Sequence, residues 1–366
     1  MTPRIVLGMT LYNNARHLRE AADSLLAQSR TDFVLLMLDD GSRDETEAIA
    51  REYERRDARV RFFQHPERQG MIPTWREVAE RASRDYPEAA YFAWVSDHDR
   101  WHPEWLARLA AELDAHPDVV LAYPLSPRIN EDGTPGLKEP RTFDTHGIGS
   151  VQERWSRFCY EGVGAGDIVY GVARIPALRA AGIFRSVLRP DRLLLAELTL
   201  HGQIRQVDEP LWFRRETSVS SVARQSVTLF AGSAPRWFVL PPWLQHGAVL
   251  FREYGGPTKV GPYEREHAPL RIPRVRLAWM VLLYGVTYTW RHIRKTETSH
   301  RIGRGVDNAY WVKKVIKKAY HYAVYETLVA MHAVHGRLRR VVRGGVRDFL
   351  ILTHRLGLRS DSQRHQ

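Results

Sequence analysis

Two apolar runs that each end in acidic side chains constrain the fold of this chain more than any other feature. Residues 33–38 lead directly into the turn Asp39-Asp40-Gly41-Ser42, and residues 91–95 lead, after one serine, into Asp97-His98-Asp99. Ligands of open α/β sheets bind beyond the carboxyl ends of the strands, so two such runs predict a nucleotide site at one sheet edge. Carboxylates at that edge suit a divalent cation held against a diphosphate.

Strand and helix patterns alternate through the first 125 residues. The expected strands are 5–11, 33–38, 60–63, 91–95 and 119–123, and the expected helices are 15–28, 44–56, 73–84 and 103–115. This alternation predicts an α/β fold, with a mostly parallel sheet flanked by helices on both faces. Farther along, residues 168–173 are predicted as a strand and residues 191–201 as a helix.

The charge of the chain is divided unevenly. Residues 226–366 contain 24 Lys and Arg against 8 Asp and Glu, about +16, whereas residues 1–225 carry about −4. We therefore expect a catalytic domain at 1–225 and a basic, α-helical C-terminal region at 226–366. The single cysteine, Cys159, excludes a disulfide framework and favours a reducing compartment. No signal-peptide pattern is expected from the first residues, which favours a cytoplasmic location.

The basic region has more than one interpretation. Its mostly apolar run at 277–290 is shorter than the roughly 20 residues that cross a bilayer. Residues 310–335 are predicted as an amphipathic helix with one lysine-rich face. Such helices suit an anionic membrane surface, at about 1 kcal/mol per basic residue. A homo-oligomerisation or packing domain is the alternative, and nucleic acid is disfavoured because no binding motif accompanies the charge.

The pattern as a whole resembles the family 2 glycosyltransferases of the GT-A (Rossmann-like) fold, over roughly residues 4–220. The resemblance is carried by five segments in order: residues 9–13, residues 39–42, residues 97–103 with Trp101 and Pro103, Asp191 eleven residues before Gly202, and residues 209–211. It implies a metal-dependent, inverting hexosyltransferase that uses a nucleotide sugar as donor.

The first acidic turn is the expected donor pocket. A carboxylate beyond a strand end can accept the imide N–H of uracil or thymine in a charge-assisted bond. In the resembling family the second aspartate contacts the base, which assigns Asp39 and Asp40, with Thr10 and Tyr12, to a UDP- or dTDP-sugar. The alternative is a polar turn that caps the next helix. Arg76 is a candidate for the diphosphate, against the interpretation as a surface arginine.

Asp97, His98 and Asp99 look like the family's metal-binding DXD motif, which holds Mn²⁺ or Mg²⁺ on the leaving diphosphate. Counting back from Pro103, His98 stands where the key metal carboxylate is usual, and imidazole suits Mn²⁺ better than Mg²⁺. Either His98 binds the metal, or the turn shifts by one residue and Asp99 does. A solvated acidic turn that caps the following helix is the structural alternative.

Asp191 is the predicted catalytic base, because an inverting transfer needs a carboxylate near the acceptor hydroxyl. The family has an acidic pair at this helix start, where this chain has Pro190 before Asp191. An ordinary aspartate favoured by the helix dipole is the alternative, and Glu197 is the fallback base. Arg214 and Arg215 are further candidates for the diphosphate.

The sequence thus predicts an inverting glycosyltransferase, peripheral on the cytoplasmic face of the cell membrane, with a lipid-linked or cell-envelope acceptor. One rival is a catalytically inactive relative kept as a membrane-bound binding or scaffold protein, supported by His98 and Pro190. A second rival, a sugar-1-phosphate nucleotidyltransferase, requires a glycine-rich phosphate loop after the first strand, and residues 7–19 lack one.

Overall fold

The computed structural model describes residues 2–140, 142–162, 167–216, 242–256 and 270–300. The chain divides into two compact units, the first comprising residues 1–253 and 266–270 and the second residues 254–265 and 271–366. The boundary predicted between residues 225 and 226 lies outside the described residues.

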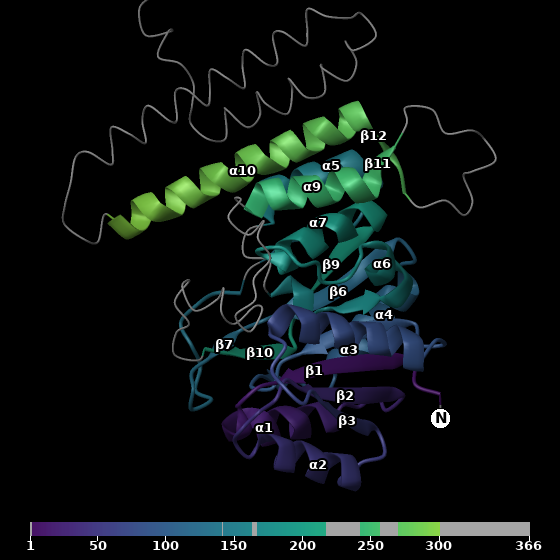
Figure 1. Ribbon diagram of the computed structural model, residues 1–366, viewed down its shortest axis with the longest axis vertical. Helices are drawn as coiled ribbons and strands as arrows, with labels where there is room; N and C mark the ends of the chain where they lie inside the picture. Colours follow the sequence, from purple (N-terminus) through teal and green to yellow (C-terminus); the bar gives the residue numbers. More distant parts are fainter. Residues whose placement is uncertain (1, 141, 163–166, 217–241, 257–269, 301–366) are drawn as a thin grey trace, which may run out of the picture. The chain divides into compact units, whose positions relative to one another are not determined.

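The first unit is built on a seven-stranded sheet in the order β3-β2-β1-β4-β8-β6-β9 (Figure 1). Its strands are β1 (Ile5–Leu11), β2 (Phe33–Asp39), β3 (Val60–Gln64), β4 (Tyr91–Val95), β6 (Val119–Leu125), β8 (Val172–Arg174) and β9 (Gln203–Pro210). All neighbours pair in parallel except β8, which is antiparallel to both β4 and β6. The predicted α/β fold with a mostly parallel sheet is confirmed.

The described part of the first unit also contains helices, several of which pack on this sheet. They are α1 (Ala15–Leu26), α2 (Thr46–Arg56), α3 (Met71–Asp85), α4 (Trp105–Ala115), α5 (Val151–Glu161), α6 (Ile175–Ala180), α7 (Pro190–His201) and α9 (Pro242–Tyr254), with a 3₁₀ turn, η1 (Ile168–Tyr170). Alternate residues of β1 join one core with α1, α2 and α4, as expected for a period of two. Gly8 faces α3 instead, where a Cβ would lie only 2.7 Å from the Phe92 ring.

The strand ends bring the acidic turns together. β1, β2 and β4 are almost completely buried, which explains their continuous apolar sequences. Leu11 at the end of β1 is level with Asp39 at the end of β2, and Met9 is level with Val95 at the end of β4. The residues after all three strands therefore lie at the same sheet edge.

Residues 168–173 were predicted as one strand, and the first half of that prediction is wrong. Residues 168–170 form η1, and only residues from 172 onward pair in β8. Gly171 makes the change possible, because it approaches β6 so closely that a Cβ would lie 2.5 Å from the Ala122 carbonyl oxygen. A side chain at this position would push the turn away from the sheet.

A small second sheet lies beyond the strand ends of the first unit. β5 (Arg100–Trp101), β10 (Trp212–Arg215) and β7 (Arg128–Ile129) pair in the order β5-β10-β7. β10 is antiparallel to β5, which directly follows the second acidic turn. This sheet therefore connects that turn to residues more than 100 positions later in the chain.

The second unit contains β11 (Gly255–Gly256), which pairs in parallel with β12 (Ile272–Pro273), and helix α10 (Arg274–His300). The apolar run at 277–290 lies inside α10. Among the described helices we find none that combines the length and apolar character needed to span a membrane. The helix predicted at 310–335 and the basic tail after it lie outside the described residues.

Candidate active site

The first acidic turn is fixed by its own side chains. The Asp39 carboxylate is fully buried, and it accepts hydrogen bonds from the Ser42 hydroxyl, from the Ser42 N–H at 3.1 Å and from Gln64 Nε2 at 3.1 Å. Gly41 in the same turn has φ of 75°, a left-handed conformation that favours glycine. Asp39 therefore shapes the turn that presents Asp40.

Asp40 lies in a nest of donors from the loop between β3 and α3. Its Oδ1 accepts the Gln69 N–H at 2.7 Å and is 3.0 Å from His65 Nδ1, and its Oδ2 accepts the Gly70 N–H at 2.8 Å. Gly70 is the N-cap of α3, so the carboxylate also sits at the positive end of a helix dipole. Only 4% of Asp40 is exposed.

His65 connects Asp40 to a second carboxylate. Its Nε2 lies 2.8 Å from Glu77 Oε2, so both ring nitrogens contact acceptors. Burial alone would lower the pKa of His65, but the hydrogen bonds to Asp40 and Glu77 outweigh burial, and the pKa is raised. A protonated His65 satisfies both carboxylates at once.

Tyr12 and Arg68 form the exposed side of the Asp40 pocket. The Arg68 guanidinium lies over the Tyr12 ring, 4.2 Å from its centroid, and Arg68 Nε is 4.0 Å from Asp40 Oδ2. Within the described part of the chain, Arg68 Nε has no hydrogen-bond partner. Thr10 is half-buried near the end of β1. Arg68 is thus the least firmly held part of this pocket.

The loop after β1 joins the two acidic turns. The Asn13 side-chain oxygen accepts the Arg43 N–H at 2.8 Å, beside the first turn. Next to it, the Asn14 amide donates to Asp97 Oδ1 at 2.8 Å, in the second turn. Asn13 has φ of 49°, an uncommon conformation for a residue other than glycine. Sequence reasoning missed Asn14, because its partner is 83 positions away.

Asp99 holds the second turn to β10. Its Oδ1 accepts the Arg215 N–H at 2.8 Å, and its Oδ2 accepts Trp212 Nε1 at 3.0 Å. Burial raises the pKa of Asp99, although the His98 charge and the hydrogen bond from the Arg215 backbone oppose it. Through these two hydrogen bonds Asp99 ties the second turn to β10.

His98 and Asp97 are arranged differently. His98 Nδ1 is 2.7 Å from Asp97 Oδ1 and 2.9 Å from the Ser96 hydroxyl. With the proton on Nδ1, the neutral ring presents its Nε2 lone pair, as in carboxylate-oriented histidine ligands. Burial would lower the pKa of His98, but Asp97 and Asp99 raise it overall.

A divalent cation at this turn would need oxygen ligands from a bound diphosphate in addition to those of the protein. Among the described residues, no three His, Cys, Asp or Glu side chains are grouped as a metal site. His98 Nε2 could supply one donor, and Asp97 could supply a second only after releasing His98 Nδ1. Asp99 Oδ1 lies 3.9 Å from His98 Nε2 and accepts the Arg215 N–H. A cation here would take its remaining oxygens from a diphosphate and water.

The two neighbouring arginines of β10 have different roles. Arg215 is buried, and it donates to the carbonyls of His98 at 2.8 Å and Glu131 at 2.7 Å. Arg214 pairs with the buried Asp167 and stays more than a third exposed. Burial would lower the pKa of Arg214, but Asp167 and then Asp99 raise it. Arg214 is therefore the better placed of the two for a diphosphate.

Asp191 occupies the start of α7, after Arg189 and Pro190. Arg189 is left-handed, with φ of 56° and ψ of 54°. Asp191 is half-buried, and burial raises its pKa against the opposing hydrogen bond and charge of Arg192. α7 packs against η1, and η1 packs against β4, whose end carries the second acidic turn. The fallback base, Glu197, is completely buried against Arg185 at 2.9 Å.

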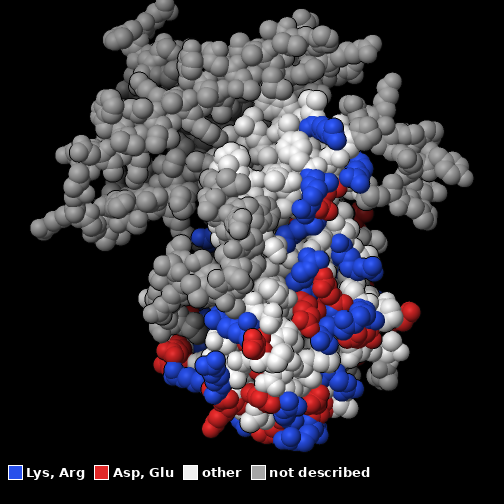
Figure 2. All heavy atoms as spheres, viewed as in Figure 1, with Lys and Arg blue, Asp and Glu red and all other residues white. Residues whose placement is uncertain are grey.

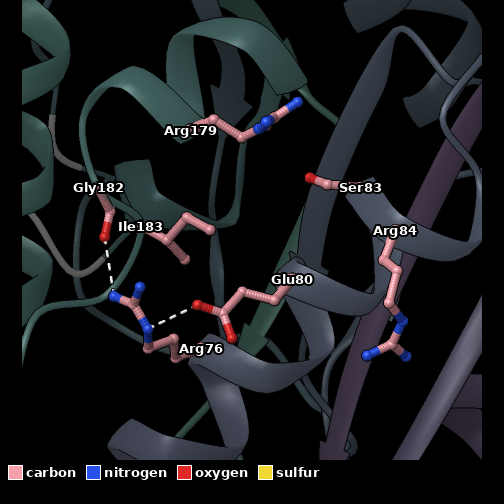
Figure 3. A pocket seen from close by; sticks show the side chains of 7 residues that line it. All are labelled: Arg76, Glu80, Ser83, Arg84, Arg179, Gly182 and Ile183. Carbon is pink, nitrogen blue, oxygen red and sulfur yellow. Dashed lines mark hydrogen bonds and ion pairs between the residues drawn. The ribbon is translucent and has the colours of Figure 1, made fainter.

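Arg76 points away from the strand ends. It donates to the carbonyl oxygens of Gly182 at 3.0 Å and Phe184 at 3.1 Å, and it pairs with Glu80 at 2.7 Å. It lies in a cavity of about 330 Å³ that is lined also by Ser83, Arg84, Arg179 and Ile183. Figure 3 shows its guanidinium between Gly182 and Glu80. None of these contacts places Arg76 near Asp40.

Residues 7–164 match the family described as Glycosyl transferase family 2. This region belongs to that family. The uncharacterized glycosyltransferase EpsJ of Bacillus subtilis is 28% identical over 121 residues, which is 33% of this chain and 33% of EpsJ. The uncharacterized protein y4gI of Sinorhizobium fredii is 27% identical over 249 residues, 64% of this chain and 25% of y4gI. This chain spans no more than a third of either relative.

The S. aureus protein TarS has a similar fold. The structure of TarS residues 1–349 in complex with UDP-GlcNAc aligns with a TM-score of 0.53 at 14% identity, covering 78% of this chain and 72% of that one. The longer TarS structure gives the same TM-score and covers 77% of this chain and 42% of that one. The predicted GT-A fold is confirmed, and the predicted family 2 match is confirmed over residues 7–164.

Proposed function

We propose that this glycosyltransferase is metal-dependent and inverting, and that it moves a sugar from a UDP- or dTDP-sugar to an acceptor hydroxyl. One observation carries the proposal: Asn13 and Asn14 join the Asp40 turn to the Asp97-His98 turn at a single sheet edge. A nucleotide sugar needs a base pocket and a diphosphate site at fixed separation. This loop supports that separation.

Asp40 is the proposed contact of the nucleobase, with Asp39, Thr10 and Tyr12 shaping its pocket. Its carboxylate oxygens accept N–H groups in this pocket, as they would accept the N–H of a pyrimidine imide. Because Asp40 is 4% exposed, a base can reach it only after Arg68 moves from the Tyr12 ring. The UDP-GlcNAc complex of TarS makes UDP-sugars the first donors to test.

The diphosphate is proposed to lie over the second turn. Asp97 and His98 would hold Mn²⁺ or Mg²⁺, which would neutralise the charge of the departing nucleotide. Asp99 keeps the turn in place through β10. Arg214, next to this turn, adds a positive charge for the phosphates. Arg76 is not proposed to contact the donor, because its guanidinium donates to the carbonyl oxygens of Gly182 and Phe184.

Asp191 is the proposed base. Its carboxylate takes the proton of the acceptor hydroxyl while that oxygen forms a bond to C1 of the sugar. The bond from C1 to the diphosphate oxygen breaks on the opposite face, its electron pair leaves with the nucleotide, and the anomeric configuration inverts. The raised pKa of Asp191 makes its carboxylate a stronger base than an exposed aspartate.

The charge distribution supports a proposal for the location and the acceptor. Figure 2 shows acidic and basic side chains interspersed on the visible face of the described residues, in keeping with the near-neutral charge of residues 1–225. The excess of about +16 lies in residues 226–366. We propose that this region attaches the enzyme to the anionic cytoplasmic face of a membrane, near a lipid-linked or cell-envelope acceptor. A homo-oligomer is the alternative.

Vesicle sedimentation separates these two attachments. Membrane attachment predicts that the full chain sediments with vesicles containing phosphatidylglycerol, stays in solution with phosphatidylcholine, and is released by salt. Failure to sediment with the anionic vesicles, together with a dimer in solution, would favour oligomerisation.

The competing function is a catalytically inactive relative that only binds. His98 in the metal motif and Pro190 beside Asp191 support it. The deciding experiment measures release of UDP from UDP-sugars with and without Mn²⁺, and follows the anomeric configuration of the product by proton NMR. The proposed enzyme releases UDP only with the cation and with inversion. Tight UDP binding without release under either condition would establish the binding protein.

A further inference from the structure

Two side chains of helix α9 form hydrogen bonds with both backbone polar groups of one residue, Leu188, and we call this pair of bonds the α9 grip. Gln245 Oε1 accepts the Leu188 N–H at 3.0 Å, and His246 Nε2 donates to the Leu188 carbonyl oxygen at 2.7 Å. Both side chains are completely buried. Two adjacent residues of α9 thus replace the backbone partners that Leu188 lacks in its loop.

The donor in the α9 grip, His246, does not change its protonation state near neutral pH. A carbonyl oxygen only accepts, so Nε2 of His246 must carry a proton. Burial lowers the pKa of His246 to about 3, partly opposed by the hydrogen bond to Leu188. The ring is therefore neutral at neutral pH, with its proton on Nε2.

Leu188 directly precedes the strained turn into α7. Arg189 is left-handed, although it is not glycine and although the following Pro190 disfavours helical conformations at this position. Such a conformation persists where its surroundings determine it. Two residues later comes Asp191, so the direction of the chain at Leu188 and Arg189 sets where the Asp191 carboxylate points.

A second contact between the same elements supports this view. Arg185, at the other end of the loop, pairs with Glu197 of α7 at 2.9 Å and with Glu253 of α9 at 3.5 Å. The loop is therefore held at both ends by α9, at Arg185 and at Leu188. α9 lies outside residues 7–164, which match the family.

We propose that α9 positions the catalytic carboxylate: Gln245 and His246 act through Leu188 to orient Asp191. They are positioning residues, since neither is proposed to touch the substrate. The inference rests on the proposed role of Asp191 as the base. It assigns a catalytic task to a helix that the sequence placed in the basic C-terminal region.

Hydrogen exchange tests the grip without any substrate. In His246→Leu, amide exchange of residues 185–192 should rise at least tenfold, because the Leu188 carbonyl loses its donor. His246→Gln, whose amide can donate to the same oxygen, should restore protection, and Leu244→Ser, at an exposed position of α9, should not alter it. Unchanged exchange in both His246→Leu and Gln245→Met would overturn the proposal.

Kinetics test the positioning. For release of UDP from UDP-GlcNAc, His246→Leu should lower kcat about 10- to 100-fold with KM within threefold of wild type, and His246→Gln should recover most of it. In an Asp191→Asn background, His246→Leu should cost nothing further. An undiminished kcat in His246→Leu, beside an inactive Asp191→Asn, would refute the inference alone. Full activity of Asp191→Asn would refute the proposed base itself.

Discussion

The two carboxylates with proposed chemical roles, Asp40 and Asp191, stand in opposite surroundings. Asp40 follows a buried strand, is almost fully covered, and accepts hydrogen bonds from three residues of one loop. Asp191 is half-buried at a helix start after a left-handed residue, and its orientation depends on a helix more than 50 positions later. The donor side is thus held directly, and the proposed base indirectly.

The comparison explains what each side does. A nucleobase site must be rigid in order to recognise one base, and hydrogen bonds from backbone N–H groups provide that rigidity. A base must remain accessible to the acceptor, so few groups can contact it, and support comes from farther away. Removing either carboxylate should therefore affect different quantities, stability for Asp40 and turnover for Asp191.

The largest expected effect is on turnover. Asp191→Asn should lower kcat for UDP release by about 10²- to 10⁴-fold, the usual contribution of a general base. Because the pKa of Asp191 is raised in the fold, its charge costs stability above the unfolded pKa, so the variant should be slightly more stable at pH 7. Steady-state kinetics and urea unfolding check both parts. A large loss of stability in Asp191→Asn with a normal kcat would show that Asp191 has a structural role instead of a catalytic one.

Next in size is the stability effect at Asp40. Asp40→Ala leaves the buried Gly70 N–H without an acceptor, at about 1–3 kcal/mol, and removes the acceptor of the partly exposed Gln69 N–H. We expect urea unfolding to show that loss, and calorimetry to show no binding of UDP. Asp40→Asn is the matched control, since one oxygen remains to accept. An Asp40→Ala protein as stable as wild type would show that the loop does not depend on this carboxylate.

A smaller effect should vary with pH at His65. Its pKa is raised in the fold, so the stabilisation from charged His65 is complete below the unfolded pKa of about 6.5 and is lost as pH rises through the folded value. The difference in unfolding free energy between wild type and His65→Gln should therefore shrink with rising pH. A difference that grows instead would mean that His65 is neutral beside Asp40.

The smallest effect concerns Arg68. The Arg68 guanidinium lies over the Tyr12 ring, an interaction of about 0.5–1 kcal/mol. If a nucleobase must displace it, Arg68→Ala should bind uridine about 2- to 5-fold more tightly, as measured by NMR titration. Uncharged uridine avoids the loss of attraction for phosphates, and Arg68→Lys controls for charge. Weaker uridine binding would indicate that Arg68 contacts the base.

The sequence located the two acidic turns but revealed little of what supports them. Strand ends are local features, so the turns at Asp40 and Asp97 could be located from apolar runs. The partners of those turns, such as Asn14, His65 and Trp212, come from 25 to 113 positions away and have no local signal. Arg76 shows the same limit, because its direction is set by carbonyls of residues 182 and 184.

The base side was harder still. Asp191 could be proposed from a helix start and a family resemblance, but its left-handed neighbour Arg189 and the grip of α9 exist only in the folded chain. The sequence also leaves open whether His98 or Asp99 binds the metal, and only the structure shows that Trp212 and Arg215 donate to both oxygens of Asp99. The C-terminal helix predicted at 310–335 stays a prediction.

Binding of nucleotides, followed by thermal shift, tests the central claim most directly. UDP, dTDP, GDP, ADP and CMP are compared with and without Mn²⁺, and a ligand at 100 times its Kd should add about 2.7 kcal/mol of stability. We predict a Mn²⁺-dependent shift with UDP or dTDP that His98→Ala reduces and Leu244→Ser leaves unchanged. No shift with any nucleotide, from a folded wild-type chain, would contradict the account.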